Sequence, residues 1–263
     1  MTVKNPAQKV ERRPGKFAEK IKTKIWKEQP CDDNPFISQG ARCYGYDLLE
    51  LAENVSLSDG LYLLFRGRLP ESHESKIFNQ LSVILMNPGP RHEACRAAMN
   101  AGVGKTEASH ILPIGLTLLG GERGTEEVVR AMRFLNKNVK HDPEKVFTVS
   151  DQPEFIPGFG LLYGGVDVQT YTYLNYLCES SEGSAAMQWC LKYCELAYEN
   201  NYGITREGMA AAAFCDLGFL PKMGGALYQL LSAPGVLAHG LEYASKPFSD
   251  FPFVDDENYV IEK

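Results

Sequence analysis

The sequence predicts an all-α protein, and three observations support that class. Apolar residues recur at helical spacing through most of the chain. The segments that they form end at clusters of Gly, Pro or Asn, as helices commonly do. The alternation of apolar and polar residues that indicates half-buried strands is almost absent. With 263 residues, the chain is long enough for one large helical domain or two unequal ones.

The first 46 residues differ from the rest of the chain. Residues 1–21 are basic, polar and without periodicity, and we expect them to form a flexible arm. Residues 22–46 are interrupted by Pro30, by Asp32–Pro35 and by Gly40, which predicts short extended structure such as a small hairpin.

A series of helices is expected from residue 56 onward. Ser56 begins the first with a pattern like a capping box, and Gly67 and Pro70 end it. Further helices are expected before the Asn87–Pro90 turn, over about 91–101, from Thr106 to Gly120, and from Thr125 onward. Residues 138–170 are rich in Pro and Gly, and we expect them to be irregular.

The second half of the chain contains the clearest amphipathic helix, around residues 187–198. Two more helices are expected over 206–217 and about 222–244, before an acidic tail rich in Pro and Phe. Cys190 and Cys194 lie four residues apart in a helical pattern, so we expect them to fill the core.

The helix that begins near Thr205 carries the most informative acid. Thr205 is a suitable N-cap, and Glu207 follows in the first turn, where the helix dipole favours a carboxylate. Gly208 lets another segment approach closely. Glu207 is therefore a candidate general base. The alternative is an acid that merely complements the dipole.

The overall composition limits the class of partner. The formal net charge of −6 argues against nucleic acid or a membrane surface as a general partner. No apolar run reaches the roughly 20 residues that cross a bilayer, and the N-terminus lacks the apolar stretch of a secretory signal. The seven cysteines form no CxxC pair. We expect a cytoplasmic protein.

Common catalytic motifs are absent from the sequence. Gly104–Thr106 resembles the end of a phosphate-binding P-loop, but Met99 stands where the first glycine is required and no strand precedes it. GxGxxG, HExxH and GxSxG are not found either.

The five histidines have different surroundings. His73 and His141 lie among polar residues and are expected to be solvated, whereas His110 and His239 lie in apolar helices and are expected in the core. His92 follows a Pro-Gly-Pro turn and is the best placed for chemistry, although a histidine at a helix start commonly faces solvent.

The loop Pro157-Gly158-Phe159-Gly160 has a composition suited to contact with a flat ligand. Its two glycines allow backbone groups to approach a flat ligand, and the Phe159 ring can pack beside that ligand. The alternative is that the loop is only a turn.

Five motifs occur in an order that is informative as a set. They are Tyr44–Ala52 with Gly60–Pro70, Gly115–Gly121, Pro157–Gly160, Pro234–His239 and Pro252–Val260. Over roughly residues 22–263 the chain resembles the citrate synthase superfamily. It is most similar to the short branch of citryl-CoA lyases and to the matching C-terminal part of ATP-citrate lyase, and the ending favours that lyase branch.

The resemblance implies an all-α homodimer that acts on an acyl-CoA thioester in a cleft between two domains. The large domain would comprise 22–120 and 206–263, and the small mobile domain 121–205. In the family an aspartate moves the α-proton, histidines stabilise the enolate oxygen, and arginines hold carboxylates. Pro157, Gly158, Phe159 and Gly160 would contact the adenine of coenzyme A through their backbone. No metal is implied.

The chain departs from the family pattern at its catalytic positions. The aspartate aligns with Glu207, which is one methylene longer. The three histidines align with Pro88, with Gly121 or Glu122, and with Leu161, and a carboxylate-binding arginine aligns with Gln169. Because the loss of one enolate-stabilising donor costs about a hundred- to a thousandfold in rate, ordinary citryl-CoA chemistry is not expected. Arg123, His92 and Glu122 could supply substitute polar groups.

Two functions therefore stay open. The first is a divergent enzyme that uses Glu207, His92 and Arg123 on an acyl-CoA with a less anionic acyl part. The second is a catalytically silent member that binds coenzyme A or a partner subunit, as a homodimer, a higher oligomer or a heteromer.

Overall fold

The computed structural model describes residues 17–121, 123–149, 156–181, 183–198, 202–252 and 254–262. Most of the predicted arm, residues 1–16, and the candidate Glu122 lie outside these ranges. Contacts group the chain into two compact units, Met1–Asn54 and Val55–Lys263. The predicted domain boundaries at 120/121 and 205/206 stay predictions.

The first unit contains the predicted hairpin. Strand β1 (Trp26–Pro30) pairs antiparallel with β2 (Ser38–Cys43), with Trp26 opposite Cys43. The short strand β3 (Tyr46–Asp47) follows after a tight turn at Gly45, whose φ of 93° favours glycine, and helix α1 (Leu48–Asn54) completes the unit.

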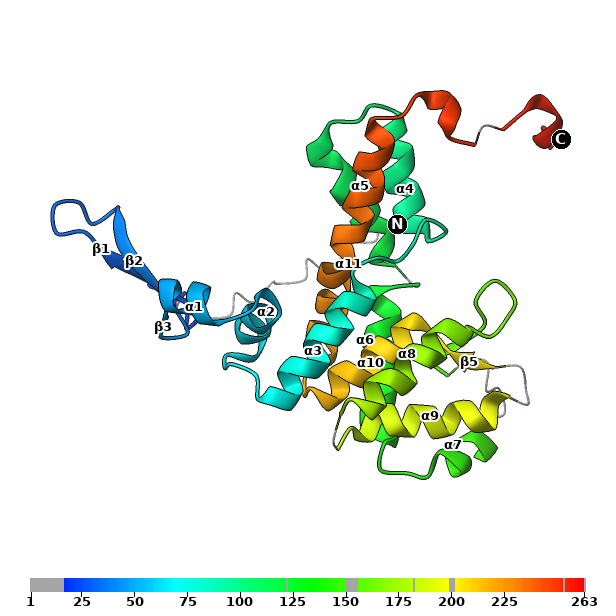
Figure 1. Ribbon diagram of the computed structural model, residues 1–263, viewed down its shortest axis with the longest axis horizontal. Coiled ribbons are helices and arrows are strands. Elements are labelled where there is room, and N and C mark those ends of the chain that lie inside the picture. The colour runs from blue at the N-terminus through cyan, green and yellow to red at the C-terminus, as the bar shows by residue number, and fades with distance from the viewer. Residues whose placement is uncertain are drawn as a thin grey trace, which may run out of the picture. The chain divides into compact units, whose positions relative to one another are not determined.

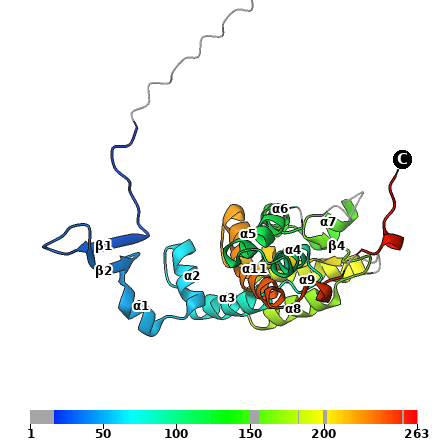
Figure 2. The same cartoon turned by 90° about the horizontal axis from the view of Figure 1, so that it is seen from above.

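The second unit is mainly helical, which confirms the predicted class (Figure 1). Its helices are α2 (Leu57–Arg66), α3 (Ser72–Leu85), α4 (Glu93–Val103), α5 (Ala108–Leu119), α6 (Thr125–Asn138), α7 (Pro143–Val149), α8 (Val168–Glu179), α9 (Ala185–Tyr198), α10 (Arg206–Asp216) and α11 (Pro221–Ala244). Two 3-10 helices, η2 (Phe248–Asp250) and η3 (Asp256–Asn258), follow α11. In both views α4 and α5 lie beside α11, with which each is in contact (Figure 2). None of the described helices combines the length and the apolar character that crossing a bilayer requires.

Helix α7 corrects the expectation that residues 138–170 are irregular. Pro143 occupies the first helical position, where its missing N–H costs nothing. The Asp142 side chain accepts from the N–H of Glu144 at 3.1 Å and so caps the helix. These two residues start a short helix inside a segment whose Pro and Gly content indicates loops.

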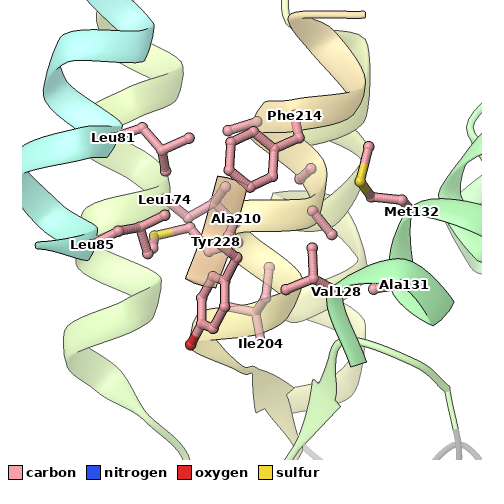
Figure 3. Packing of buried hydrophobic residues seen from close by; sticks show 14 of the residues in the cluster. Leu81, Leu85, Val128, Ala131, Met132, Leu174, Ile204, Ala210, Phe214 and Tyr228 are labelled. Atoms are coloured by element: carbon pink, nitrogen blue, oxygen red, sulfur yellow. The ribbon is translucent and has the colours of Figure 1, made fainter. Parts of the chain in front are cut away.

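The core of the second unit surrounds helix α10. All residues from Gly208 to Phe214 are buried, and four of them are alanines, so neighbouring helices approach from several sides. Figure 3 shows Ala210 and Phe214 with Leu81 and Leu85 of α3, Val128 and Met132 of α6, Leu174 of α8 and Tyr228 of α11. Cys190 and Cys194 are buried in this core, as predicted.

A buried polar cluster joins α2 to α3 away from the centre of the core. The fully buried Tyr62 donates its hydroxyl to Glu74 at 2.8 Å, and Arg68 donates to both oxygens of the same carboxylate, at 2.6 and 2.7 Å. The guanidinium lowers the pKa of Glu74 to about 2. This carboxylate is therefore ionised and fully engaged at neutral pH.

The segment before α8 is held on the start of α10 by backbone contact. Strand β4 (Phe159–Gly160) pairs antiparallel with β5 (Gly203–Ile204), and the Gly158 carbonyl accepts from the N–H of Thr205 at 3.0 Å. A Cβ on Gly158 would lie 2.8 Å from the Cα of Gly208, and a Cβ on Gly208 would overlap the Gly158 carbonyl. The predicted close approach at Gly208 is confirmed, and its partner is Gly158.

We predict that Gly208→Ala destabilises the protein by about 1–3 kcal/mol, because the added methyl has no space against the Gly158 backbone. The measurement is the free energy of unfolding in urea. Gly60→Ala is the matched control, since Gly60 lies in α2 with nothing within 4 Å of an added Cβ. It should stabilise the helix by about 0.5–1 kcal/mol. If both substitutions changed the free energy of unfolding equally, the contact with Gly158 would not limit which side chain position 208 accepts.

Candidate active site

A pocket of about 250 Å³ lies at the N-terminal end of α10. The starts of α4 and α6, the β4–α8 loop and the start of α10 each contribute to its lining. Glu207, His92 and Arg123, the three predicted catalytic residues, all line it. Residues that lie more than a hundred positions apart are thereby brought to one place.

Glu207 is positioned by the cap of α10. The Thr205 hydroxyl accepts from the N–H of Gly208 at 3.2 Å, as the N-cap prediction requires, so Glu207 lies in the first turn. Its side chain is partly buried, and the Tyr228 hydroxyl of α11 donates to Oε1 at 2.9 Å. Burial, with the nearby Glu207 charge, raises the pKa of Tyr228 well above its usual value. Tyr228 therefore stays protonated and acts as a donor.

His92 is the N-cap of α4. Its Nδ1 accepts from the N–H of Ala94 at 3.1 Å, which places the proton of the neutral imidazole on Nε2. Burial lowers the pKa of His92, against the opposing influence of Glu93 and Glu207. At neutral pH the ring therefore presents an N–H donor. The interpretation of His92 as a solvent-facing residue is wrong, because its side chain is only 14% exposed and lines the pocket.

The other described histidines do not contribute to the pocket. His110 is exposed and His239 is partly buried beside Asn87, so the prediction that both lie in the core is wrong. The buried stripe of α5 runs through Ile111, Gly115 and Leu119, which leaves His110 outside it. His73 and His141 are exposed, as predicted.

The arginines of the pocket already have partners within the protein. Arg123 lies 3.4 Å from Glu93 and is 69% exposed. Arg130 lies 2.9 Å from Glu127, and Arg206 donates to the carbonyl of Leu85 at 2.8 Å. The described lining contains three arginines and four carboxylates, Arg123, Arg130, Arg206, Glu93, Glu127, Asp167 and Glu207. With His92 neutral, this set carries a formal charge of 3 − 4 = −1, which does not favour a polycarboxylate.

The Pro157–Gly160 loop meets the pocket at one end only. Gly160 lines it, whereas the Phe159 ring is buried against Tyr193, with ring centroids 4.6 Å apart. The expectation that the Phe159 ring packs beside a ligand is not met in this arrangement. The N–H of Gly158 donates to Glu127 at 2.6 Å, and its carbonyl is bound to Thr205. Gly160 is therefore the loop residue best placed to contact a ligand.

A larger pocket of about 480 Å³ lies between α8, α9 and β5 and shares Ile204 with the first. Its lining is mostly apolar and aromatic, with Glu195 as its one carboxylate among the described residues. Its described lining contains no histidine and no arginine. The three predicted catalytic residues all line the smaller pocket.

Of the described positions that align with the family's histidines and arginine, Leu161 lines the pocket, whereas Pro88, Gly121 and Gln169 do not. Other residues of the site were not predicted from the sequence. Tyr228, Arg206 and Glu127 were missed, because their roles depend on contacts between helices that no local pattern records.

Solved structures share the fold of this chain. Citryl-CoA lyase from Hydrogenobacter thermophilus aligns with a TM-score of 0.75 at 23% sequence identity, over 92% of this chain and 94% of the lyase. The chain has the citrate synthase fold. Citrate synthase from Thermotoga maritima aligns with a TM-score of 0.53 at 15% identity, over 92% of this chain and 94% of the synthase.

A third structure is ATP citrate lyase from Methanothrix soehngenii in complex with citrate and coenzyme A. It aligns with a TM-score of 0.69 at 17% identity over 96% of this chain, which spans 44% of that protein. No family model matches the sequence, and neither does any curated protein. The structures confirm the citrate synthase fold in the short, citryl-CoA lyase-like form that the five motifs indicated.

The cap formed by His92 leads to a prediction about pH. A histidine whose pKa is lowered on folding stabilises the protein above its unfolded pKa, near 6.5, and loses that contribution as the pH falls. Asparagine is an equally good N-cap and does not titrate. We predict that His92→Asn removes part of the loss of stability between pH 7.5 and pH 5, measured by urea unfolding.

His73→Asn is the matched control, since the His73 side chain is 54% exposed. Its effect on stability serves as the reference for loss of an exposed imidazole. If the two substitutions had the same effect, the buried cap at His92 would not exist in solution.

Proposed function

We propose that the chain is a citrate synthase-like enzyme that acts on an acyl-CoA thioester and makes or breaks a C–C bond by a Claisen-type mechanism. The shared fold with citryl-CoA lyase and with an ATP citrate lyase that binds citrate and coenzyme A supports this class. The observation that carries the proposal is that a carboxylate, Glu207, and a neutral imidazole donor, His92, line one pocket.

In the synthetic direction Glu207 takes a proton from the carbon next to the thioester carbonyl. The electron pair of that C–H bond moves onto the carbonyl oxygen, and the resulting enolate oxygen accepts a hydrogen bond from Nε2–H of His92. The α-carbon then attacks the carbonyl carbon of the second reactant, the π electron pair of that carbonyl moves onto its oxygen, and the oxygen takes a proton from solvent. In the cleavage direction that hydroxyl loses its proton, the C–C bond breaks to give the enolate, and Glu207 returns a proton to the α-carbon.

A neutral imidazole suits this role. It donates a hydrogen bond without giving up its proton to the enolate, and it needs no reorganisation because the Ala94 N–H fixes its tautomer. His92 would thus replace the donors that the family places at Pro88, at Gly121 or Glu122, and at Leu161. Arg123, exposed at the pocket edge, would offset the negative charge that develops in the transition state.

The charges of the pocket indicate the kind of acyl group. The three arginines in the described lining of the pocket are engaged by Glu93, by Glu127 and by a backbone carbonyl, so none of these three is left to bind a tricarboxylate as its main partner. Leu161 and Leu162 add apolar surface. The substrate that fits this pocket is an acyl-CoA with an uncharged acyl part. We propose that the protein acts on it as a homodimer in the cytoplasm.

The second candidate is a silent relative that binds coenzyme A or a partner subunit. The observation in its favour is that the three family histidines align with Pro88, with Gly121 or Glu122, and with Leu161. The two candidates differ in whether an α-proton leaves the thioester.

The test is hydrogen exchange in deuterated water. Purified protein is incubated with acetyl-, propionyl- and butyryl-CoA, and deuterium at the α-carbon is measured by mass spectrometry. We predict exchange that falls at least about a hundredfold in Glu207→Gln and about a hundred- to a thousandfold in His92→Asn.

Glu195→Gln is the control, because Glu195 is a carboxylate in the neighbouring pocket. It should exchange at the wild-type rate. Wild-type binding of the thioester without any exchange would establish the silent candidate, and full exchange in Glu207→Gln would remove Glu207 as the base.

A further inference from the structure

We propose that Tyr228 is the positioning residue that holds the Glu207 carboxylate in the orientation needed for proton transfer. This inference rests on the proposed function, because it concerns the same site. It adds to that site a residue that does not itself line the pocket. Tyr228 lies 21 residues beyond Glu207, on the next helix, and its hydroxyl donates to Oε1 at 2.9 Å.

The position of the hydroxyl is fixed by the core. Tyr228 is fully buried, and Figure 3 shows its ring among the apolar side chains that surround α10. A ring packed on all sides has little freedom to move, so its oxygen is a fixed point. The hydrogen bond joins Glu207 to that point and engages one of its two oxygens.

Glutamate needs such a constraint more than aspartate does. It has one further methylene and one further rotatable bond, so its carboxylate can occupy more positions from the same backbone. Proton transfer requires the base to be held within a narrow range of distance and angle. The bond from Tyr228 supplies the restriction that the longer side chain would otherwise lack.

The hydrogen bond requires the Tyr228 hydroxyl to stay protonated. Burial raises the pKa of Tyr228, which therefore remains a donor throughout the working range. The other titratable groups that line the pocket around Glu207 are His92, Glu93, Arg123, Glu127, Arg130, Tyr163, Asp167 and Arg206. The substitution Tyr228→Phe leaves all of them in place.

The chain offers a matched control in a second buried pair. Tyr62 is also fully buried and donates to a glutamate, Glu74, at 2.8 Å. Neither residue lines the pocket. Tyr62→Phe therefore removes the same kind of hydrogen bond outside the candidate active site.

The experiment measures α-proton exchange of the acyl-CoA in wild type, Tyr228→Phe and Tyr62→Phe. We expect Tyr228→Phe to lower kcat about tenfold with KM within about twofold. Tyr62→Phe should change neither. If Tyr228→Phe matched Tyr62→Phe in kcat and in KM, the positioning role would be overturned.

A further variant covers the case in which Tyr228→Phe does not fold. Glu207→Asp keeps the acid but shortens the side chain away from the Tyr228 hydroxyl, and it should lower kcat by a similar factor. A rate equal to that of wild type would overturn the proposal.

A second readout separates this inference from the proposed function. In protein labelled with ¹³C at tyrosine Cζ, the Tyr228 resonance is identified by its loss in Tyr228→Phe. It should shift in Glu207→Gln and stay in place in Glu74→Gln. Should the wild type exchange no thioester, the enzymatic proposal fails, yet a shifted resonance still supports the constraint on Glu207. An unmoved resonance overturns it.

Discussion

The site depends on the contact between two backbones at Gly158 and Gly208. Neither position has room for a Cβ, and Gly158 has a φ of 86°, where glycine is favoured. Because the two segments touch, the loop after Gly158 continues across the start of α10, and Gly160, Leu161 and Glu207 line one pocket. A larger residue at either position would separate the acid from the loop that covers it.

The N-caps of two helices position the side chains that are proposed to react. Thr205 caps α10 and places Glu207 in its first turn, while His92 caps α4 and so fixes its own tautomer. Two helix starts thus bring the proposed base, Glu207, and the proposed donor, His92, to one pocket. The pairing of the arginines with protein groups leaves the pocket without a strong site for a polycarboxylate, which distinguishes it from the family pattern that the sequence resembles.

The sequence was sufficient for the features that follow from local patterns. Helical spacing predicted the class, the Thr205 cap placed Glu207, and Gly208 indicated a close approach. Features set by long-range packing were not predictable in this way. Tyr228 reaches Glu207 only because α11 packs against α10, and His110 is exposed because the buried stripe of α5 runs past it. Helix α7 was missed because Pro and Gly content outweighed the cap at Asp142.

The proposed roles of Glu207 and His92 are tested most directly by a crystal structure of the protein with an acetyl-CoA analogue whose sulfur is replaced by a methylene group. We predict that the α-carbon lies about 3–3.5 Å from a carboxylate oxygen of Glu207, with the adjacent carbonyl oxygen hydrogen-bonded to Nε2 of His92. An analogue bound elsewhere, or a Glu207 side chain turned into bulk water away from the 157–160 loop, would contradict it.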